Sequence, residues 1–439
     1  MSSQNVETSA TASVTGTFFD RMARTTLERM LGSFQGGRIT LRDGPTERTF
    51  GSSMSGDSVV RVDVQSPRFY RRILTGGSLG AAEAFLDGDW SCGDLTTLIR
   101  MLIQNLSVTR NMDRGLAKVT GLVARAGHWM RRNSRAGSRR NIEAHYDLGN
   151  DFFKLFLDDT LLYSAGIFER PESTLREASV AKMDRICRRL DLQSSDHVLE
   201  IGTGWGGFAI HVANHFGCRM TTATISREQY DLARRRVHEA GLEQRVEVIL
   251  RDYRDLGGQY DKLVSIEMIE AVGQRYFDTY FRKCGELLKP DGLMLLQGIV
   301  MNEQGYAEYL RSTDFIQRYI FPGGCLPSVL AMGQSIAKTT DMRMLHVEDI
   351  APHYAQTLRC WRERFWGAID QVRELGFTER FIRMWHYYLC YCEAAFDERS
   401  VGVVQMLLAK PGNRRDLQSD PTPAMSNRHS SPAATWGAP

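Results

Sequence analysis

Four glycines within six residues follow a short apolar run near the middle of the chain, and they restrict what can fold around them. The segment is Val198-Leu-Glu-Ile-Gly-Thr-Gly-Trp-Gly-Gly-Phe-Ala-Ile210. It predicts a buried strand, a tight turn and the start of a helix. Because glycine has no Cβ and tolerates positive φ, the N–H groups of the turn can approach a ligand closely. The segment therefore predicts a nucleotide-type site at the carboxyl end of a first parallel strand.

The residues around this turn distinguish it from other glycine-rich turns. No Gly-Lys-Ser/Thr follows it, so it is not a phosphate-binding P-loop. The next expected strand, 219–225, leads into Ser226 without the acid with which dehydrogenases bind the ribose of a dinucleotide. An acid on the strand before the turn, Glu200, instead favours S-adenosylmethionine, with its methionine portion over the turn.

Strands and helices alternate along the chain around the turn. Apolar runs predict strands at 196–201, 219–225, 246–251, 262–267 and 293–300, and helices at 174–190, 208–215 and 227–240. The alternation predicts an α/β fold with a doubly wound, Rossmann-like parallel sheet. Helices around 354–373 and 379–396 follow, and a last strand at 402–408 is expected to close the sheet. The ligand belongs at the carboxyl ends of the strands, including 252–253 and 267–270.

The length of 439 residues predicts two domains. Residues 17–109 are expected to form a small α+β domain without a catalytic constellation, with strands at 38–42 and 59–64 and helices at 69–74, 81–86 and 94–104. Residues 141–410 are expected to form the catalytic domain. The polar segments 1–16 and 411–439 are expected to be disordered.

A basic linker, 110–140, joins the two expected domains. It has a single acid, Asp113, and nine basic residues, Arg110, Arg114, Lys118, Arg125, Arg131, Arg132, Arg135, Arg139 and Arg140. Two interpretations stay open: a solvated linker helix, and a surface that attaches to anionic phospholipid headgroups. Nucleic acid is disfavoured because no nucleic-acid-binding motif accompanies the charge. The net charge of +3 indicates no partner by itself.

The eight cysteines form no CxxC pair and no metal-ligand spacing, so we expect reduced thiols, no metal site and a cytoplasmic protein. The first sixteen residues lack the apolar core of a signal peptide. No window of 18 apolar residues predicts a membrane span.

Several segments of the second expected domain carry a family resemblance. They are Val198–Gly207, Asn141–Asp158, Tyr163-Ser164, Ser265-Ile-Glu-Met-Ile-Glu-Ala-Val-Gly273 and Arg318-Tyr-Ile-Phe-Pro-Gly-Gly-Cys-Leu-Pro327. From about 140 to 410 the chain resembles the cyclopropane-fatty-acyl-phospholipid synthases and mycolic acid cyclopropane synthases. The small first domain resembles that of the bacterial phospholipid enzymes. The resemblance implies the class I fold of S-adenosylmethionine-dependent methyltransferases, preceded by a small α+β domain.

The resemblance also implies a reaction. A cis double bond in a phospholipid acyl chain attacks the sulfonium methyl group, a carbocation forms, and loss of a proton closes a cyclopropane ring. Because an alkene is a poor nucleophile, catalysis must come from positioning, a dry pocket and stabilisation of the cation. The alternative product is a methyl-branched or methylene chain that forms without ring closure.

The matching motifs place cofactor contacts on nine residues: Tyr163, Ser164, Glu200, Gly202, Gly204, Thr224, Gln229, Asp252 and Tyr253. Thr224 and Gln229 would stand in for the missing acid of the second strand.

Bicarbonate is the second candidate cofactor, because the resemblance implies a bound bicarbonate as the base. The matching positions are Ala165, Glu270, Gln297, Ile299 and Tyr354. Ala165 and Gln297 depart from the family pattern of cysteine and histidine, which motivates the alternative product. Gln297 can still donate a hydrogen bond to an anion.

Further candidates carry competing interpretations. Cys392 matches a cysteine proposed as catalytic in the family, yet its helical spacing suits core packing and the reaction needs no thiol. His145 is a candidate for orienting the segment that covers the cofactor. Phe315, Tyr319 and Phe321 suit the core or the wall of an acyl pocket.

The partners implied by the resemblance are an unsaturated phospholipid at the inner face of a membrane, with peripheral attachment and no nucleic acid. A homodimer stays open. A catalytically inactive lipid- or cofactor-binding protein and a small-molecule methyltransferase are the competing functions.

Overall fold

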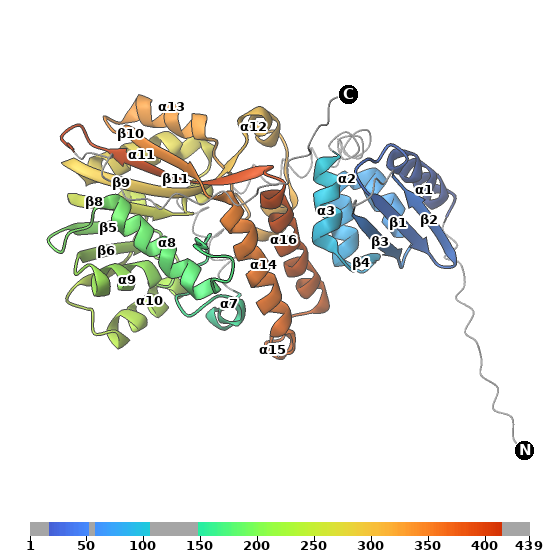
Figure 1. The fold of residues 1–439 in the computed structure, drawn as a ribbon, viewed down its shortest axis with the longest axis horizontal. Coiled ribbons are helices and arrows are strands. Elements are labelled where there is room, and N and C mark those ends of the chain that lie inside the picture. The colour runs from blue at the N-terminus through green and yellow to red at the C-terminus, as the bar shows by residue number, and fades with distance from the viewer. Residues whose placement is uncertain (1–16, 52–57, 106–147, 415–439) are drawn as a thin grey trace, which may run out of the picture.

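The computed structural model describes residues 17–51, 58–105 and 148–414. Two β-sheets organise them, one of four strands near the N-terminus and one of seven strands in the remainder (Figure 1). The predicted basic linker, His145, and the termini 1–16 and 415–439 lie outside the described residues.

The smaller sheet has the strand order β2-β1-β3-β4. Its elements are α1 (Phe18–Leu31), β1 (Arg38–Asp43), β2 (Thr46–Phe50), β3 (Val59–Val64), α2 (Arg68–Leu86), β4 (Trp90–Cys92) and α3 (Leu95–Gln104). The two predicted strands are confirmed as β1 and β3, which pair in parallel.

Helix α2 contains the two short helices predicted at 69–74 and 81–86. They are separated by a kink at Gly77, whose φ of 59° and ψ of −140° are not helical, so the predicted interruption by the glycines is confirmed. A Cβ at Gly80 would lie 2.0 Å from the carbonyl oxygen of Arg72. Only glycine permits this close approach of one half of the helix to the other.

The larger sheet begins with the predicted strand–helix alternation. Its first elements are α7 (Asn150–Phe156), α8 (Leu175–Leu190), β5 (His197–Ile201), α9 (Gly207–His215), β6 (Arg219–Thr224), α10 (Arg227–Glu239), β7 (Val246–Leu250), β8 (Tyr260–Ile266), α11 (Phe277–Leu287) and β9 (Leu288–Met301). β8 pairs in parallel with β5 and β9, and β6 pairs in parallel with β5 and β7.

The C-terminal part adds two antiparallel strands and a group of helices. They are α12 (Glu303–Tyr309), a π-helical turn (Ile316–Ile320), α13 (Val329–Thr339), β10 (Arg343–Asp349), α14 (Ala351–Gly367), α15 (Ile369–Glu374), α16 (Glu379–Asp397) and β11 (Val401–Ala409). The predicted last strand is confirmed as β11 of this sheet, but it does not form the edge, because it lies between β9 and the edge strand β10. The side chains of β10 are either exposed or half-buried, so this strand lacks the apolar run that marks a central strand.

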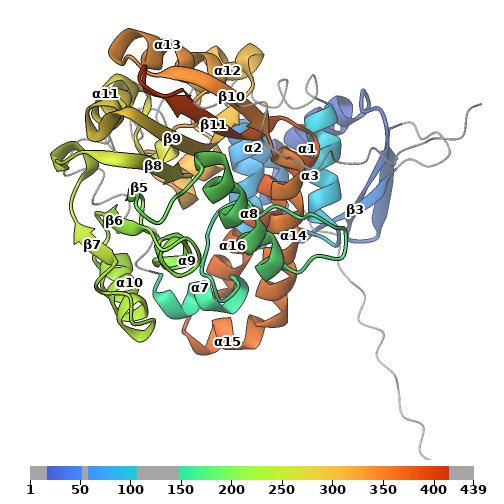
Figure 2. The same ribbon diagram turned by 60° about the vertical axis from the view of Figure 1, so that its left-hand side comes forward.

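Helices cover both faces of the larger sheet (Figure 2). Side chains of β5 alternate between them: Val198 packs in the cluster of α8 and α9, and Leu199 and Ile201 pack in the cluster of α11. Burial on both faces explains why the parallel strands read as continuous apolar runs.

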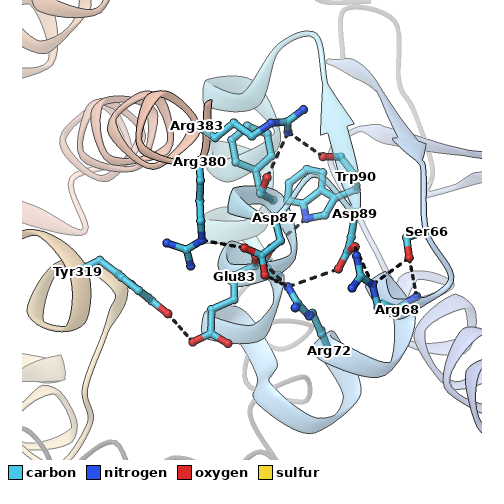
Figure 3. A network of polar contacts seen from close by, with 12 residues as sticks. Ser66, Arg68, Arg72, Glu83, Asp87, Asp89, Trp90, Tyr319, Arg380 and Arg383 are labelled. Carbon is cyan, nitrogen blue, oxygen red and sulfur yellow. Dashed lines mark hydrogen bonds and ion pairs between the residues drawn. The ribbon is translucent and has the colours of Figure 1, made fainter. Parts of the chain in front are cut away.

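The N-terminal part joins the remainder of the chain through α2 and α3, which pack against α16 (Figure 1). Figure 3 shows the polar contacts at this junction. Asp87, just after α2, accepts hydrogen bonds from Arg72 and from Arg380 of α16. The Tyr319 hydroxyl donates to Glu83 of α2 over 2.7 Å. The N-terminal part and α16 therefore meet through direct packing and polar contacts.

Candidate active site

A cavity of about 1710 Å³ opens at the carboxyl ends of β5, β6 and β8. All nine predicted cofactor residues line it, namely Tyr163, Ser164, Glu200, Gly202, Gly204, Thr224, Gln229, Asp252 and Tyr253. Four of the predicted catalytic residues also line it: Glu270, Ile299, Tyr354 and Cys392. Gln297 and Ala165 are fully buried behind the wall.

The glycine turn has the geometry of a ligand cradle. Gly202, Gly204 and Gly206 have φ values of 105°, 52° and 84°, which side chains rarely adopt. A Cβ added at Gly204 would meet no atom within 4 Å, so the turn leaves space on its cavity side. At Gly207 an added Cβ would lie 2.3 Å from the carbonyl oxygen of Thr160. Gly207 thus allows close packing against Thr160, and Gly204 leaves room for a ligand to approach the turn.

Glu200 lies on the strand below this cradle and is 2% exposed. Its carboxylate accepts a hydrogen bond of 2.6 Å from the hydroxyl of Thr222 on β6. Burial raises the pKa of Glu200 to about 8, against the opposing effects of Thr222 and Lys182. A cationic ligand group above Glu200 would favour the ionised carboxylate. The residues present therefore fit S-adenosylmethionine, which carries a sulfonium and an ammonium group.

The side chains at the ends of β6 and β7 are held by local hydrogen bonds. Ser226 caps α10, and this places Gln229 in the first turn of the helix, where it accepts a hydrogen bond from Thr224 over 2.9 Å. Asp252 accepts hydrogen bonds from the guanidinium of Arg254. These polar groups are fixed around one end of the cavity before a ligand arrives.

Lys182 is a buried cation that the sequence analysis overlooked. It lies on the buried stripe of α8 at 0% exposure, and its ammonium donates to the Ser164 hydroxyl over 2.5 Å. Burial lowers the pKa of Lys182 to about 8, while Glu267, Asp158 and Glu200 oppose that shift. A sequence signal for this buried lysine does exist: Lys182 stands at i+7 from Leu175, on the apolar stripe of the helix.

Glu267 is the second residue that the sequence analysis left without a role. It follows β8, and its carboxylate accepts hydrogen bonds from the Ala165 N–H (2.9 Å), the Gln297 amide (2.8 Å) and the Tyr354 hydroxyl (2.7 Å). These are three of the five groups expected to hold bicarbonate. Because Glu267 occupies them, the donors present do not fit a bicarbonate ion at this place.

Glu270 lies one short turn beyond Glu267 in the same wall. Its Oε1 accepts from the Ile299 N–H over 2.5 Å, and its Oε2 is buried without a partner. Burial and then the charge of Glu267 raise the pKa of Glu270 to about 8. Glu270 is therefore mainly a neutral acid near pH 7.

Replacing Glu270 with glutamine is expected to stabilise the protein at pH 8 and to change it little at pH 5. The folded pKa lies above the ordinary carboxyl value, so the folded state holds the proton more tightly than the unfolded state, and stability is lost as pH rises from about 4.5 to 8. The loss at pH 8 is on the order of 4 kcal/mol, because one pKa unit corresponds to about 1.4 kcal/mol, and glutamine removes it. Urea denaturation at both pH values measures the free energy of unfolding. Replacement of the exposed Glu308 by glutamine is the control. Parallel pH profiles for wild type and E270Q would contradict the assignment.

The remaining candidates divide between the cavity and the core. Cys392 faces the cavity, and burial raises the pKa of its thiol, which argues against a thiolate nucleophile. Phe321 lines the cavity, whereas Phe315 is core and Tyr319 binds Glu83. All eight cysteines are free thiols.

One wall of the cavity comes from the N-terminal part, where no catalytic constellation was expected. Helix α2 contributes Arg72, Thr75, Gly76, Ser78, Leu79, Gly80 and Glu83. Sequence patterns could not show this, because the wall forms only when α2 packs beside α16 and the 316–320 turn.

Two absences can be stated for 17–51, 58–105 and 148–414. No helix in these ranges is long and apolar enough to cross a membrane. No group of three or more metal-ligating side chains is found among the same residues.

Comparison with known proteins identifies the family. The family model described as mycolic acid cyclopropane synthetase matches residues 133–406. The tuberculostearic acid methyltransferase UfaA1 of Mycobacterium tuberculosis (strain ATCC 25618 / H37Rv) is 41% identical over 78% of this chain and 81% of its own length. The cyclopropane-fatty-acyl-phospholipid synthase of Escherichia coli (strain K12) is 34% identical over 82% and 90%.

A solved structure extends the similarity to three dimensions. Mycolic acid cyclopropane synthase CmaA1, in complex with SAH and CTAB, superposes with a TM-score of 0.58 at 31% identity, over 62% of this chain and 98% of that one. The family match covers the glycine turn, both glutamates and Tyr354. The chain belongs to the mycolic acid cyclopropane synthetase family of S-adenosylmethionine-dependent lipid methyltransferases.

Proposed function

We propose that the protein transfers the methyl carbon of S-adenosylmethionine to the cis double bond of an unsaturated acyl chain in a phospholipid. One observation carries the proposal: the space above the glycine turn continues past Glu267 and Glu270 to α2 as a single cavity of about 1710 Å³. Pockets for one drug-sized ligand have volumes of about 300–1,000 Å³. The cavity therefore has room for a long second substrate beside the cofactor.

The cavity wall suits a reaction that passes through a cation. S-adenosylmethionine supplies an electrophilic methyl group, and its transfer to an alkene leaves a positive charge on the second alkene carbon. Aromatic side chains line the cavity, namely Tyr163, Tyr253, Tyr309, Phe321, Tyr354, Tyr388, Tyr391 and Phe396. Aromatic ring faces attract a cation, and exclusion of water around it would keep it from being quenched.

The cation has two outcomes that are consistent with the family. Loss of a proton from the new methyl group with ring closure gives a cyclopropane, as the name of the Escherichia coli relative indicates for that enzyme. Loss of a proton without ring closure gives a methylene branch or a methyl-branched alkene, and a saturated methyl branch would need a separate two-electron reduction afterwards. The carboxylate of Glu267 and the 41% identity to a tuberculostearic acid methyltransferase favour this second candidate.

The proposed substrate arrives from a membrane surface. Arg311 and Arg399 are exposed at the cavity wall near α12 and β11, where they suit the phosphate of a headgroup. The basic residues 110–140 support peripheral attachment to the inner face of a membrane, and they lie outside the described part of the chain.

Methyl-labelled cofactor tests the function. The purified protein is expected to transfer the label to acyl chains of vesicles that contain cis-unsaturated phospholipid, and not to saturated vesicles. Gas chromatography of the methyl esters before and after mild hydrogenation then separates the products, because a methylene branch takes up hydrogen and a cyclopropane resists it. Label in the headgroup, or none in either lipid, would overturn the proposal.

A further inference from the structure

The carboxylate of Glu267 is fixed in the cavity wall by donors from three separate elements. The Ala165 N–H belongs to the segment after α7, the Gln297 amide to β9 and the Tyr354 hydroxyl to α14, at 2.9, 2.8 and 2.7 Å. The Gln297 side chain is itself oriented by a 3.0 Å hydrogen bond from Gln405 on β11 to its Oε1. Glu267 lines the cavity while its carboxylate is withdrawn from bulk solvent.

The backbone at Glu267 is also constrained. Its φ is 48°, in the left-handed region that costs a non-glycine residue on the order of 1–2 kcal/mol. Its N–H donates to the Gln297 carbonyl oxygen over 2.7 Å, which holds the residue in this conformation. A carboxylate held at such a cost beside a cavity points to a role in function rather than in packing alone.

The ionisable groups around Glu267 favour its charged form over that of Glu270. Burial raises the pKa of Glu267, and Lys182 of α8 and the three donors oppose that shift. Glu270 has one N–H donor, and the negative charge of Glu267 disfavours its ionisation. Tyr354 faces the pair as a neutral hydroxyl, because burial raises its pKa well above the ordinary value. Of the two carboxyl groups, Glu267 is therefore the one whose ionised form the surrounding groups favour more.

We propose that Glu267 is the base of the reaction and that its side-chain carboxylate stands where a bound bicarbonate would otherwise accept the proton. The assignment deepens the proposed function and rests on it. It differs from the family pattern implied by the resemblance, in which an exchangeable anion takes this role.

The step balances without another reactant. After methyl transfer, one C–H bond of the lipid cation breaks and its electron pair stays in the lipid, where it forms either the third bond of a cyclopropane ring or a carbon–carbon double bond. The proton passes to a carboxylate oxygen of Glu267. Before the proton transfer, the positive charge of Lys182 compensates the negative charge of Glu267. Afterwards, release of the proton to solvent restores the ionised carboxylate.

Replacing Glu267 with glutamine removes the charge and keeps the shape. E267Q is expected to lower kcat about 100-fold or more, since general bases contribute that much, with little change in KM for the lipid or in calorimetric affinity for S-adenosylhomocysteine. Glu286→Gln, an exposed change on α11 outside the cavity, is the matched control and is expected to retain the wild-type rate. A wild-type rate in E267Q would overturn the assignment.

Replacing Glu267 with glycine tests the place of the carboxylate directly. Glycine tolerates φ 48° and leaves the Ala165, Gln297 and Tyr354 donors free for a small anion. E267G is expected to regain activity when bicarbonate or formate is added, whereas wild type is expected to be insensitive to bicarbonate removal. Binding of ¹³C-bicarbonate, followed by NMR without cofactor, is expected for E267G and not for wild type.

The outcomes separate the inference from the function on which it rests. Wild-type protein that methylates no lipid would overturn the proposed function. Wild-type protein that methylates lipid but binds bicarbonate and needs it would overturn only the assignment of Glu267. If E267G does not fold, E267Q together with the bicarbonate requirement of wild type still decides the question.

Discussion

Replacing Lys182 with methionine is expected to destabilise the protein by about 3–5 kcal/mol near neutral pH, because loss of one partner leaves buried charge uncompensated. Lys182 is fully buried, and the carboxylates of Glu267, Glu200 and Asp158 raise its pKa against the effect of burial. Methionine has a similar length, so the change removes charge more than volume. The loss is expected to be smaller at pH 5, where the carboxylates can take up protons.

The same substitution is expected to shift catalysis. Without Lys182 the pKa of Glu267 rises further, so the acid limb of the pH–rate profile moves to higher pH. Urea denaturation at pH 5 and 8 and a pH profile of kcat measure the two effects. Lys338→Met removes an exposed lysine that pairs with Asp278, and it is expected to cost about 1 kcal/mol or less. Equal costs for the two variants would contradict the role of Lys182.

Replacing Gly204 with alanine is expected to weaken cofactor binding about tenfold or more while it costs about 1 kcal/mol in stability. The stability cost comes from the φ of 52°, which alanine adopts only with strain. The binding loss comes from the new methyl group, which enters the open space on the cavity side of the turn. Calorimetric titration with S-adenosylhomocysteine and urea denaturation separate the two.

Gly241 offers a matched control outside the cavity. Its φ is 67°, and an added Cβ there also meets nothing within 4 Å. Gly241→Ala is expected to lose the same stability and to bind S-adenosylhomocysteine as wild type does. If both variants lost affinity equally, the loss would reflect backbone strain and not occupation of the cradle.

The parts of the fold that could be predicted are those buried on both faces. The parallel strands β5 to β9 are apolar runs bounded by turns, and the predicted ranges agree with them to within a few residues, except at the start of β9. β2, β4 and β10 escaped prediction because they are short or exposed, so their side chains carry little periodic signal.

The candidate site was predictable as a set of residues and not as a set of contacts. The motifs gathered the nine predicted cofactor residues, which line one cavity. Glu267, however, takes its donors from residues 102, 30 and 87 positions away. One donor is a backbone N–H, which residue type does not encode. Which carboxylate binds a given group of donors is decided by tertiary structure.

The position of β11 sets a condition on the order of folding. Among the strands within 17–51, 58–105 and 148–414 this one is synthesised last, yet in that part of the chain it alone pairs with β10, and it is one of the two that flank β9. It also supplies Gln405, which orients Gln297, and Val401 of the cavity wall. A nascent chain can therefore form the glycine turn long before it can form the proton-accepting side of the cavity. Until residues 401–409 are synthesised, β9 and β10 present unpaired edges, which are sites where unfinished chains associate.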